Sequence, residues 1–310
     1  MLQPRTTVVV LAGGTGGAKL ARGMLDLVGD DLVVIANTGD DIDIHGAHVS
    51  PDPDLVSFWL ADRIDERGWG LADDTFTVMD GLRELGVDVW FNLGDRDLAW
   101  CLERRRRLDE GATPTQALAV LAAAIGSGGR VLPMCDEQVR TRVRTDGRWT
   151  GFQEFMVRER GAGPVEDVVF DGIEAARPTP AVLEALAGAR AILIGPSNPI
   201  ISIGPILAVP GMREALRAAP APVVAVSPLV GGEVLKGPTA SFMAGAGLPL
   251  SSAGIAQAYT GVADALLADE AGDVDGVAVR IADTLMGDAA ARRAVAAEAL
   301  DLADGVRMDA

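Results

Sequence analysis

The sequence predicts an α/β protein, built on a doubly wound, Rossmann-like, mostly parallel sheet with a β-rich and helical insertion. Short, fully apolar runs recur along the 310 residues, which is typical of parallel strands covered by helices on both faces. A glycine loop and a helical pattern follow the first run, and Gly, Asn, Ser and Asp residues follow the others. No Pro/Gly/Ser-rich linker separates two halves. We therefore expect residues 1–310 to form a single domain.

The N-terminal segment reads as a β–loop–α–β unit. Thr6–Ala12 is a β-branched apolar run that ends at Gly13–Gly17. Ala18–Val28 then has apolar residues at helical spacing, and Leu32–Ala36 is a second buried strand.

The rest of the chain continues the alternation of strands and helices. Further strands are expected at Val87–Phe91, Ala191–Ile194, Val223–Val226, Ala263–Leu267 and Val277–Ile281. Helices are expected at Leu55–Ile64, Thr75–Leu85, Arg96–Leu108, Pro114–Ile125, Pro180–Ala187, Ser251–Tyr259 and Asp288–Ala303.

A segment from roughly residue 129 to 178 differs from this pattern. Apolar and polar residues alternate from Val139 to Thr145, and Asp146-Gly147 is a strong hairpin signal. A second alternating run then extends to Val157. We interpret the segment as a β-rich insertion beside the main sheet.

Composition excludes several classes of function. Lys and Arg number 27 against 44 Asp and Glu, which gives a formal charge of −17. Nucleic acids and anionic membranes both require basic surface, so neither is an expected partner. The N-terminus lacks the features of a signal peptide, and no apolar stretch is long enough to span a bilayer. Two cysteines, Cys101 and Cys135, fit a reducing compartment, and we expect a cytoplasmic protein.

Polar loops follow five of the expected strands. They are Gly13–Gly17, Asn37–Asp43, Asn92–Asp97, Gly195–Pro199 and Ser227–Gly232. Ligands of open parallel sheets bind beyond the carboxyl ends of the strands, so these loops predict a site at that edge.

The glycine loop is the clearest element of this predicted site. Backbone N–H groups of Gly13, Gly14, Thr15, Gly16 and Gly17, together with the N-terminus of the next helix, suit a phosphate group. The loop matches neither the dinucleotide fingerprint nor the P-loop. Lys19 either contacts the phosphate or is an exposed helix lysine.

Acidic residues beside the glycine loop suggest a magnesium site. Asp40, Asp41 and Asp43 follow the second strand, and Asp52 and Asp54 follow Pro51. Mg²⁺ binds one or two carboxylates and shares the oxygens of a phosphate. Asp41 and Asp54 are the preferred candidates, although turn formation and helix capping would explain them equally well.

Other charged residues near these loops have simpler explanations. His45 and His48 lack a third partner for a transition metal. Four consecutive arginines, residues 104–107, are expected to pair with Glu103, Asp109 and Glu110 on a helix surface.

Several motifs, taken together, resemble the 2-phospho-L-lactate transferase family, including its actinobacterial-type phosphoenolpyruvate transferases. The motifs are Val10–Lys19, Asn37–Asp41, Pro51–Asp54, Leu93–Asp97, Phe152–Glu154, Gly195–Gly204 and the tail Val274–Arg280. They occur in the same order as in that family, whose members act in the biosynthesis of the deazaflavin coenzyme factor 420.

The resemblance implies a reaction and assigns residues to it. A ribityl hydroxyl of the deazaflavin Fo (7,8-didemethyl-8-hydroxy-5-deazariboflavin) attacks a guanosine diphosphate-linked donor that carries phosphoenolpyruvate or 2-phospho-L-lactate, and GMP leaves. Gly13–Gly17, Ser197 and Asn198 would hold the guanosine diphosphate part, and Asp41 and Asp54 would be the catalytic and Mg²⁺-binding residues. Asp54 and Asn92 would contact Fo, although some members have Lys in place of Asn92. The resemblance also implies a homodimer. On this assignment, Asp54→Asn removes most turnover from a folded protein.

Two other functions are open at this stage. The related glycine-loop group includes nucleotide-sugar-binding regulatory proteins that transfer nothing. An NAD-dependent dehydrogenase is disfavoured, because the fingerprint fails and Ala36-Asn37 stands where a ribose-binding acid is expected.

Overall fold

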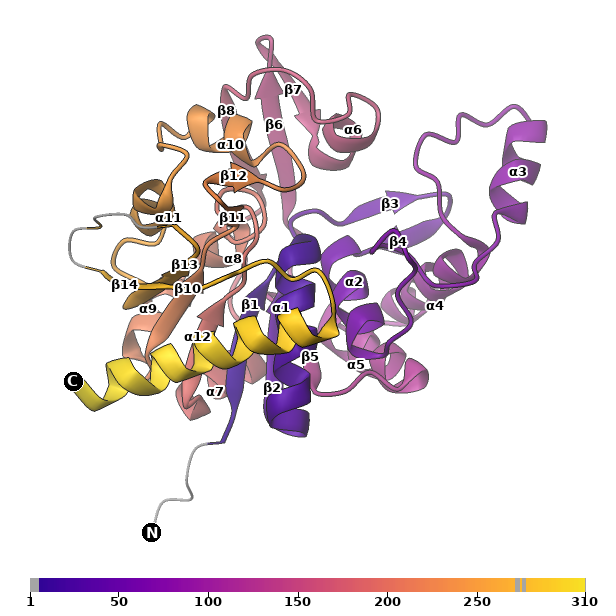
Figure 1. The fold of residues 1–310 in the computed structure, drawn as a ribbon. Helices are drawn as coiled ribbons and strands as arrows, with labels where there is room; N and C mark the ends of the chain where they lie inside the picture. The colour runs from indigo at the N-terminus through magenta and orange to yellow at the C-terminus, as the bar shows by residue number, and fades with distance from the viewer. Residues whose placement is uncertain (1–5, 271–273, 275–276, 310) are drawn as a thin grey trace.

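The computed structural model describes residues 6–270, 274 and 277–309. Seven parallel strands form its central sheet in the order β14-β13-β10-β9-β1-β2-β5 (Figure 1). These strands are β1 (Val8–Ala12), β2 (Leu32–Ala36), β5 (Arg130–Pro133), β9 (Ala191–Ile194), β10 (Val223–Val226), β13 (Ala265–Ala268) and β14 (Ala278–Ile281). The chain winds outward from β1 to β5, returns to β9 beside β1, and winds outward again to β14. This confirms the predicted doubly wound α/β class, with its switch point between β1 and β9.

Helices cover both faces of the central sheet (Figure 1). The helices of the described residues are α1 (Gly14–Val28), α2 (Pro51–Leu60), α3 (Thr77–Glu84), α4 (Asp95–Asp109), α5 (Pro114–Ile125), α6 (Phe152–Val157), α7 (Pro180–Gly188), α8 (Gly204–Ala208), α9 (Met212–Ala218), α10 (Thr239–Gly245), α11 (Ser252–Ala258) and α12 (Ala289–Asp309), with a 3₁₀ turn at Gly29–Asp31. No helix in the described part of the chain is both long and apolar enough to cross a membrane.

Alternation along each buried strand creates two separate cores. In β1, Val8 and Val10 face one core and Val9 and Leu11 face the other, and all four are fully buried. The first core contains residues of α1, α2, α4, α5 and α12, whereas the second contains residues of α7, α8, α9 and α11. A strand buried on both faces must be apolar throughout, which explains the short apolar runs of the sequence.

The expected strand at Val87–Phe91 is wrong. The segment has no regular structure and leads from α3 to α4, in the arm at the right of Figure 1. Val87 is 42% exposed, so this β-branched side chain is not buried between helices as it would be in a central strand. The sheet position next to β2 is instead taken by β5, which pairs with β2 in parallel.

The insertion contains one antiparallel strand more than the two that the alternation predicts, and β5 belongs to the central sheet. Beside that sheet lies a three-stranded antiparallel sheet in the order β7-β6-β8, made of β6 (Arg140–Thr145), β7 (Arg148–Gly151) and β8 (Asp167–Asp171). The predicted turn is confirmed, because Asp146 and Gly147 both have positive φ between β6 and β7. The expected strand to Val157 is wrong beyond Gly151, where α6 begins.

Two small hairpins complete the secondary structure. They are β3 (Ile42–Ile44) with β4 (Ala47–Val49), and β11 (Leu229–Val230) with β12 (Glu233–Val234). Both lie in segments that follow the carboxyl ends of central strands, β2 and β10 respectively.

Candidate functional site

A cavity of about 450 Å³ lies at the carboxyl edge of the sheet, at the switch point. Four of the five predicted loops contribute to it, from the ends of β1, β2, β9 and β10, and α6 and the segment after β14 complete it. Its polar lining residues include Gly13, Gly14, Thr15, Gly16, Lys19, Asp40, Asp52, Gln153, Ser197, Asn198, Ser202, Ser227, Lys236, Thr239 and Thr284. The apolar lining is contributed mainly by Phe152, Met156, Ile201, Val230, Val234, Leu235, Leu285 and Met286.

The glycine loop packs directly against the loop that follows β9. A Cβ placed on Gly16 would lie 1.9 Å from the carbonyl oxygen of Pro196, so no larger residue fits there. The N–H of Gly17 donates to Ser197 Oγ at 3.1 Å. Amides in the first turn of a helix have no intrahelical acceptor, so those of Thr15 and Gly16 are the ones that face a ligand.

The carboxylate of Asp52, on α2, contacts the beginning of the glycine loop. Its Oδ1 accepts the N–H of Gly14 at 2.6 Å, and its Oδ2 accepts the side-chain amide of Asn37 at 2.9 Å. Burial raises the pKa of Asp52 to about 6, against the lowering effect of these two hydrogen bonds. The sequence places Asp52 among the acidic residues of the suggested magnesium site but favours Asp41 and Asp54 as the ligands. Asp52 follows Pro51 directly, and this position at the start of α2 is the local signal for it.

Asp40 is the second carboxylate of the cavity. Its side chain is 5% exposed, and its Oδ1 is buried without a hydrogen-bond partner among the described residues. Burial raises the pKa of Asp40 well above its ordinary value, and the charge of Asp52 raises it further. The insertion holds this loop, because Gln153 Nε2 donates to the backbone oxygen of Asp40 at 3.0 Å.

Two buried carboxylates that line one cavity, with the charge of Asp52 raising the pKa of Asp40, fit a divalent cation. Mg²⁺ needs only one or two protein carboxylates when phosphate oxygens complete its shell. In the described part of the chain no three His, Cys, Asp or Glu side chains gather as an all-protein metal cluster. The donor set of Asp40 and Asp52 is therefore suited to a magnesium ion shared with a phosphorylated ligand, and not to a structural metal.

Asp54, the other acidic residue at the start of α2, does not line this cavity. It is 5% exposed, and its oxygens accept hydrogen bonds from Trp100 Nε1 at 2.7 Å and from the guanidinium of Arg104. Arg104 is itself 3% exposed, so it makes a buried ion pair with α2. The neighbouring arginines behave as expected on the surface, where Arg105, Arg106 and Arg107 pair with Asp109, Glu103 and Glu110.

Asp41 is also held by protein groups. Its Oδ1 accepts the hydroxyl of Ser50 at 2.7 Å, and its Oδ2 lies 3.2 Å from Nε2 of His48. Asp43 Oδ1 lies 2.8 Å from the other ring nitrogen of His48. Burial lowers the pKa of His48, but hydrogen bonding to the two carboxylates outweighs it and the net shift is upward.

Ser197 and Asn198 both line the cavity, as the sequence predicts for residues at this edge. Asn198 Oδ1 accepts the backbone N–H groups of Ile200 and Ile201, which fixes the turn after β9. Its Nδ2 lies 3.4 Å from Thr239 Oγ1. Asn198 therefore ties the loops after β9 and β10 together at the cavity.

The segment Asn92–Asp97 does not reach the cavity. Asp95 caps α3 by accepting from the amides of Thr77 and Val78, and Asp74 caps α4 by accepting from the amides of Arg96 and Asp97. This reciprocal capping joins the two helices of the arm. Asn92 is exposed, and its Oδ1 accepts from Arg83 at 2.6 Å.

A smaller hollow of about 280 Å³ adjoins the cavity. It shares Asp40, Phe152 and Gln153 with the cavity, and Trp90, Asp41, Arg140 and Arg142 contribute to its walls. Asp40 therefore stands where the two spaces meet.

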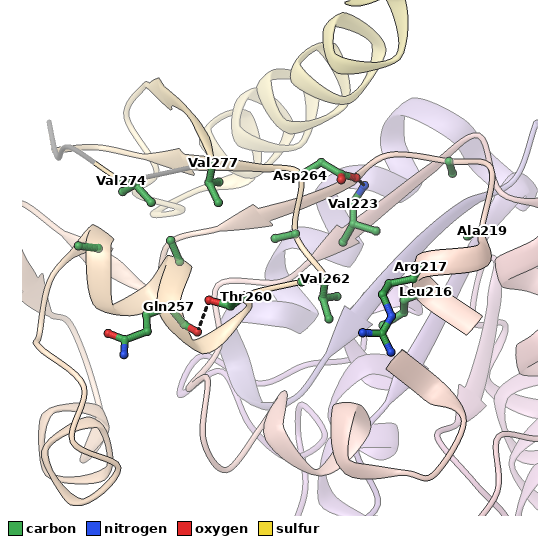
Figure 2. Close-up of a pocket in the computed structure, with 15 residues that line it drawn as sticks. Leu216, Arg217, Ala219, Val223, Gln257, Thr260, Val262, Asp264, Val274 and Val277 are labelled. Carbon is green, nitrogen blue, oxygen red and sulfur yellow. Dashed lines mark hydrogen bonds between the residues drawn. The ribbon is translucent and has the colours of Figure 1, made fainter. Parts of the chain in front are cut away.

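A larger cavity, of about 860 Å³, lies on the opposite edge of the sheet (Figure 2). It surrounds the beginnings of β10 and β13, where Val223 and Asp264 lie. The carboxylate of Asp264 accepts the N–H of Val223 and so serves the backbone. Because ligands of doubly wound sheets bind at the carboxyl edge, we assign the candidate site to the smaller cavity at the switch point.

The fold and this site define a doubly wound α/β protein with a glycine loop and a polar cavity at its switch point. The chain belongs to the family described as 2-phospho-L-lactate transferase CofD, whose model matches residues 8–298. It is accordingly a transferase.

Named relatives cover nearly the whole chain. A phosphoenolpyruvate transferase from Kitasatospora aureofaciens is 43% identical over 97% of this chain and 98% of its own length. A 2-phospho-L-lactate transferase from Methanosarcina mazei is 38% identical over 90% of this chain and 94% of its own length. A solved UPF0052-family protein from Bacillus halodurans has the same fold, with a TM-score of 0.64 at 17% identity over 95% of this chain and 98% of that one.

Proposed function

We propose that this protein transfers a phosphoenolpyruvyl or 2-phospho-L-lactyl group from a guanosine diphosphate-linked donor to the ribityl hydroxyl of Fo, in the biosynthesis of the deazaflavin coenzyme factor 420. The observation that carries the proposal is the pair of buried carboxylates, Asp40 and Asp52, beside the glycine loop. The names of the two relatives support the transferred group.

The donor is assigned to the cavity at the switch point. The first-turn amides of Thr15 and Gly16 suit its phosphate oxygens, with Ser197 and Asn198 on the adjoining loop. The apolar walls around Leu235 and Leu285 suit the base. A magnesium ion at Asp40 and Asp52, rather than at Asp41 and Asp54, would neutralise the diphosphate and the leaving GMP.

Fo is assigned to the adjoining hollow. Trp90 and Phe152 offer aromatic surface to its ring system. Asn92, the residue that the family resemblance assigns to Fo, is only two positions from Trp90. The family resemblance includes members with a lysine at the position of Asn92. In this chain the guanidinium of Arg83 donates to Asn92, so a cation is still present beside that position.

Asp40 is then the residue between the two substrates. The ribityl oxygen forms a bond to the phosphorus that carries the three-carbon group, the bond from that phosphorus to the oxygen of GMP breaks, and GMP leaves with the electron pair. The hydroxyl proton goes to Oδ1 of Asp40, the carboxylate oxygen that has no partner among the described residues. Asp52, held by Gly14 and Asn37, keeps the phosphate end in place.

The test is mass spectrometry of the product formed from Fo, GTP, a guanylyltransferase and each candidate three-carbon phosphate. Asp40→Asn and Asp52→Asn are expected to lower turnover by about 100-fold or more, because each removes a group that touches the reacting atoms or their metal. Asp109→Asn is the matched control, since Asp109 lies on the exposed end of α4, and it should retain turnover within about twofold.

The alternative, a regulatory nucleotide-binding protein, makes the opposite prediction. GDP would bind, Fo would not, and no product would form with any three-carbon phosphate. Full activity of both Asp→Asn variants would overturn the assignment of Asp40 and Asp52 while leaving the reaction itself standing.

A further inference from the structure

The distribution of lysine is unusual in this chain. Of the 27 basic residues only two are lysines, Lys19 and Lys236. Both line the cavity at the switch point, and no arginine among the described residues does. The charged residues of this lining are therefore two lysines and two aspartates, Asp40 and Asp52.

Neither lysine has an acidic partner in the part of the chain that the structure describes. The protein carries 44 acidic residues, and its arginines form ion pairs over much of the surface. Within residues 6–270, 274 and 277–309, Lys19 and Lys236 make no ion pair at all. In a chain with such an excess of carboxylates, two unpaired ammonium groups at one cavity mark a place for a ligand that is itself an anion.

The two ammonium groups come from different parts of the fold. Lys19 lies on α1, two residues after the glycine loop, and its Nζ donates to the backbone oxygen of Met286 at 3.1 Å. Lys236 is exposed and lies between β12 and α10. Both face the same cavity, and burial lowers the pKa of Lys19 while the charges of Arg292 and Lys236 lower it further. An anionic ligand would relieve this repulsion.

We propose that Lys19 and Lys236 form a cationic pair that binds the phosphate chain of the donor. This inference rests on the proposed function, and it names the side chains that recognise the nucleoside diphosphate. The glycine loop supplies neutral N–H donors, whereas the lysines supply the positive charge that binding a diphosphate requires in a protein of charge −17.

Lysine suits this position better than arginine does. Its ammonium is a compact charge on a flexible stem, so it can follow a phosphate oxygen as the phosphorus changes its geometry during transfer. An arginine at residue 236 would hold two oxygens in one fixed plane. Lys236→Arg is therefore expected to keep most of the affinity for GDP and to lose more in turnover than in binding.

The first experiment is calorimetric titration of the full chain with magnesium GDP and with guanosine. Lys19→Gln and Lys236→Gln are each expected to weaken GDP binding by about 10- to 100-fold, the range for one charge-assisted hydrogen bond, and to leave guanosine binding within twofold. Arg106→Gln is the control, because it removes one positive charge from a residue whose side chain is 51% exposed on α4, away from the cavity.

The second experiment uses the scarcity of lysine directly. Apart from the N-terminus, Lys19 and Lys236 are the only amines that an acylating reagent can label. Peptide mass spectrometry should find both labelled in the free protein and both protected by magnesium GDP.

Unchanged GDP affinity in both glutamine variants, or labelling that GDP does not reduce, overturns the cationic pair. An equal loss of GDP and guanosine binding also overturns it, because that result indicates damage to the cavity rather than loss of a phosphate contact. These results are distinct from failure of the proposed function, in which the native protein protects its lysines with GDP but forms no product with Fo.

Discussion

The buried ion pair between Asp54 and Arg104 gives the sharpest prediction from this structure. Asp54 is 5% exposed and Arg104 is 3% exposed, so solvent cannot replace either partner. In Asp54→Asn, the new amide can still accept from Trp100, but its NH₂ group faces the guanidinium of Arg104, donor against donor. An uncompensated buried charge costs about 3–5 kcal/mol. For a chain of this size that corresponds to a fall in melting temperature of about 5–15 °C.

The assay is thermal denaturation followed by circular dichroism, with turnover measured well below the transition. The decisive comparison is the double variant Asp54→Leu/Arg104→Met, which removes both charges from a site that already contains Phe58, Trp100 and Cys101. It should melt within about 5 °C of the native protein, because replacing both partners of a buried pair with apolar groups is often neutral.

The reasoning fails if Asp54→Asn melts within about 2 °C of the native protein. A stable Asp54→Asn variant that loses turnover but binds magnesium GDP normally would return Asp54 to the catalytic role that the sequence suggests. A stable double variant that is inactive but binds magnesium GDP normally would assign Asp54 a contact with substrate in addition to its structural role.

Three further predictions follow from other parts of the molecule. Burial raises the pKa of Asp97 to about 7 from 3.8, so the native state holds one proton more than the unfolded state between these pH values. The stability of the native protein relative to Asp97→Asn should therefore fall as pH rises from about 4 to 7. Urea titrations at pH 5 and pH 8 should show that the variant exceeds the native protein in free energy of unfolding by more at pH 8. Gly16→Ala should abolish GDP binding, since its Cβ would overlap the carbonyl oxygen of Pro196, whereas Gly81→Ala in α3, with nothing within 4 Å, should bind GDP normally and melt no lower than the native protein. Chelation of Mg²⁺ by EDTA should weaken GDP binding at least tenfold in the native protein, and much less in Asp40→Asn/Asp52→Asn, as titration calorimetry can measure.

The sequence predicts most of the fold because local and tertiary signals agree there. For α5, Pro114 and the capping box of Thr113 and Gln116 mark the start, and Gly126 in the left-handed conformation marks the end, so the expected and observed bounds are the same. In the central sheet, strands buried on both faces stand out as fully apolar runs. Val87–Phe91 is apolar except for Asp88, but no local signal reveals that β5, some forty residues later, takes the place beside β2.

A cavity lies at the edge of the sheet where the sequence predicts the site, but the sequence could not tell which carboxylates face this cavity. Asp52 and Asp54 are two residues apart at the start of α2. Helical residues are separated by about 100° each, so these two side chains point in directions about 200° apart. Asp52 therefore reaches Gly14, and Asp54 reaches Arg104 on the far side of the helix. Only the packing of α2 between α1 and α4 decides which acid meets the ligand.

The same geometry explains why both acids belong to one short motif. Asp52 needs a fixed position beside the glycine loop. Burial raises its pKa and the charge of Asp41 raises it further, so both effects disfavour its ionised form at that position. Asp54 supplies that rigidity, since its ion pair with Arg104 anchors the first turn of α2 to α4. The motif Pro51–Asp54 thus places one carboxylate at the ligand and uses the other to hold it there. Loss of Asp54 is accordingly expected to reduce turnover because Asp52 is displaced. An Asp54 variant that keeps its fold should bind magnesium GDP more weakly than the native protein, with a smaller change in its affinity for Fo.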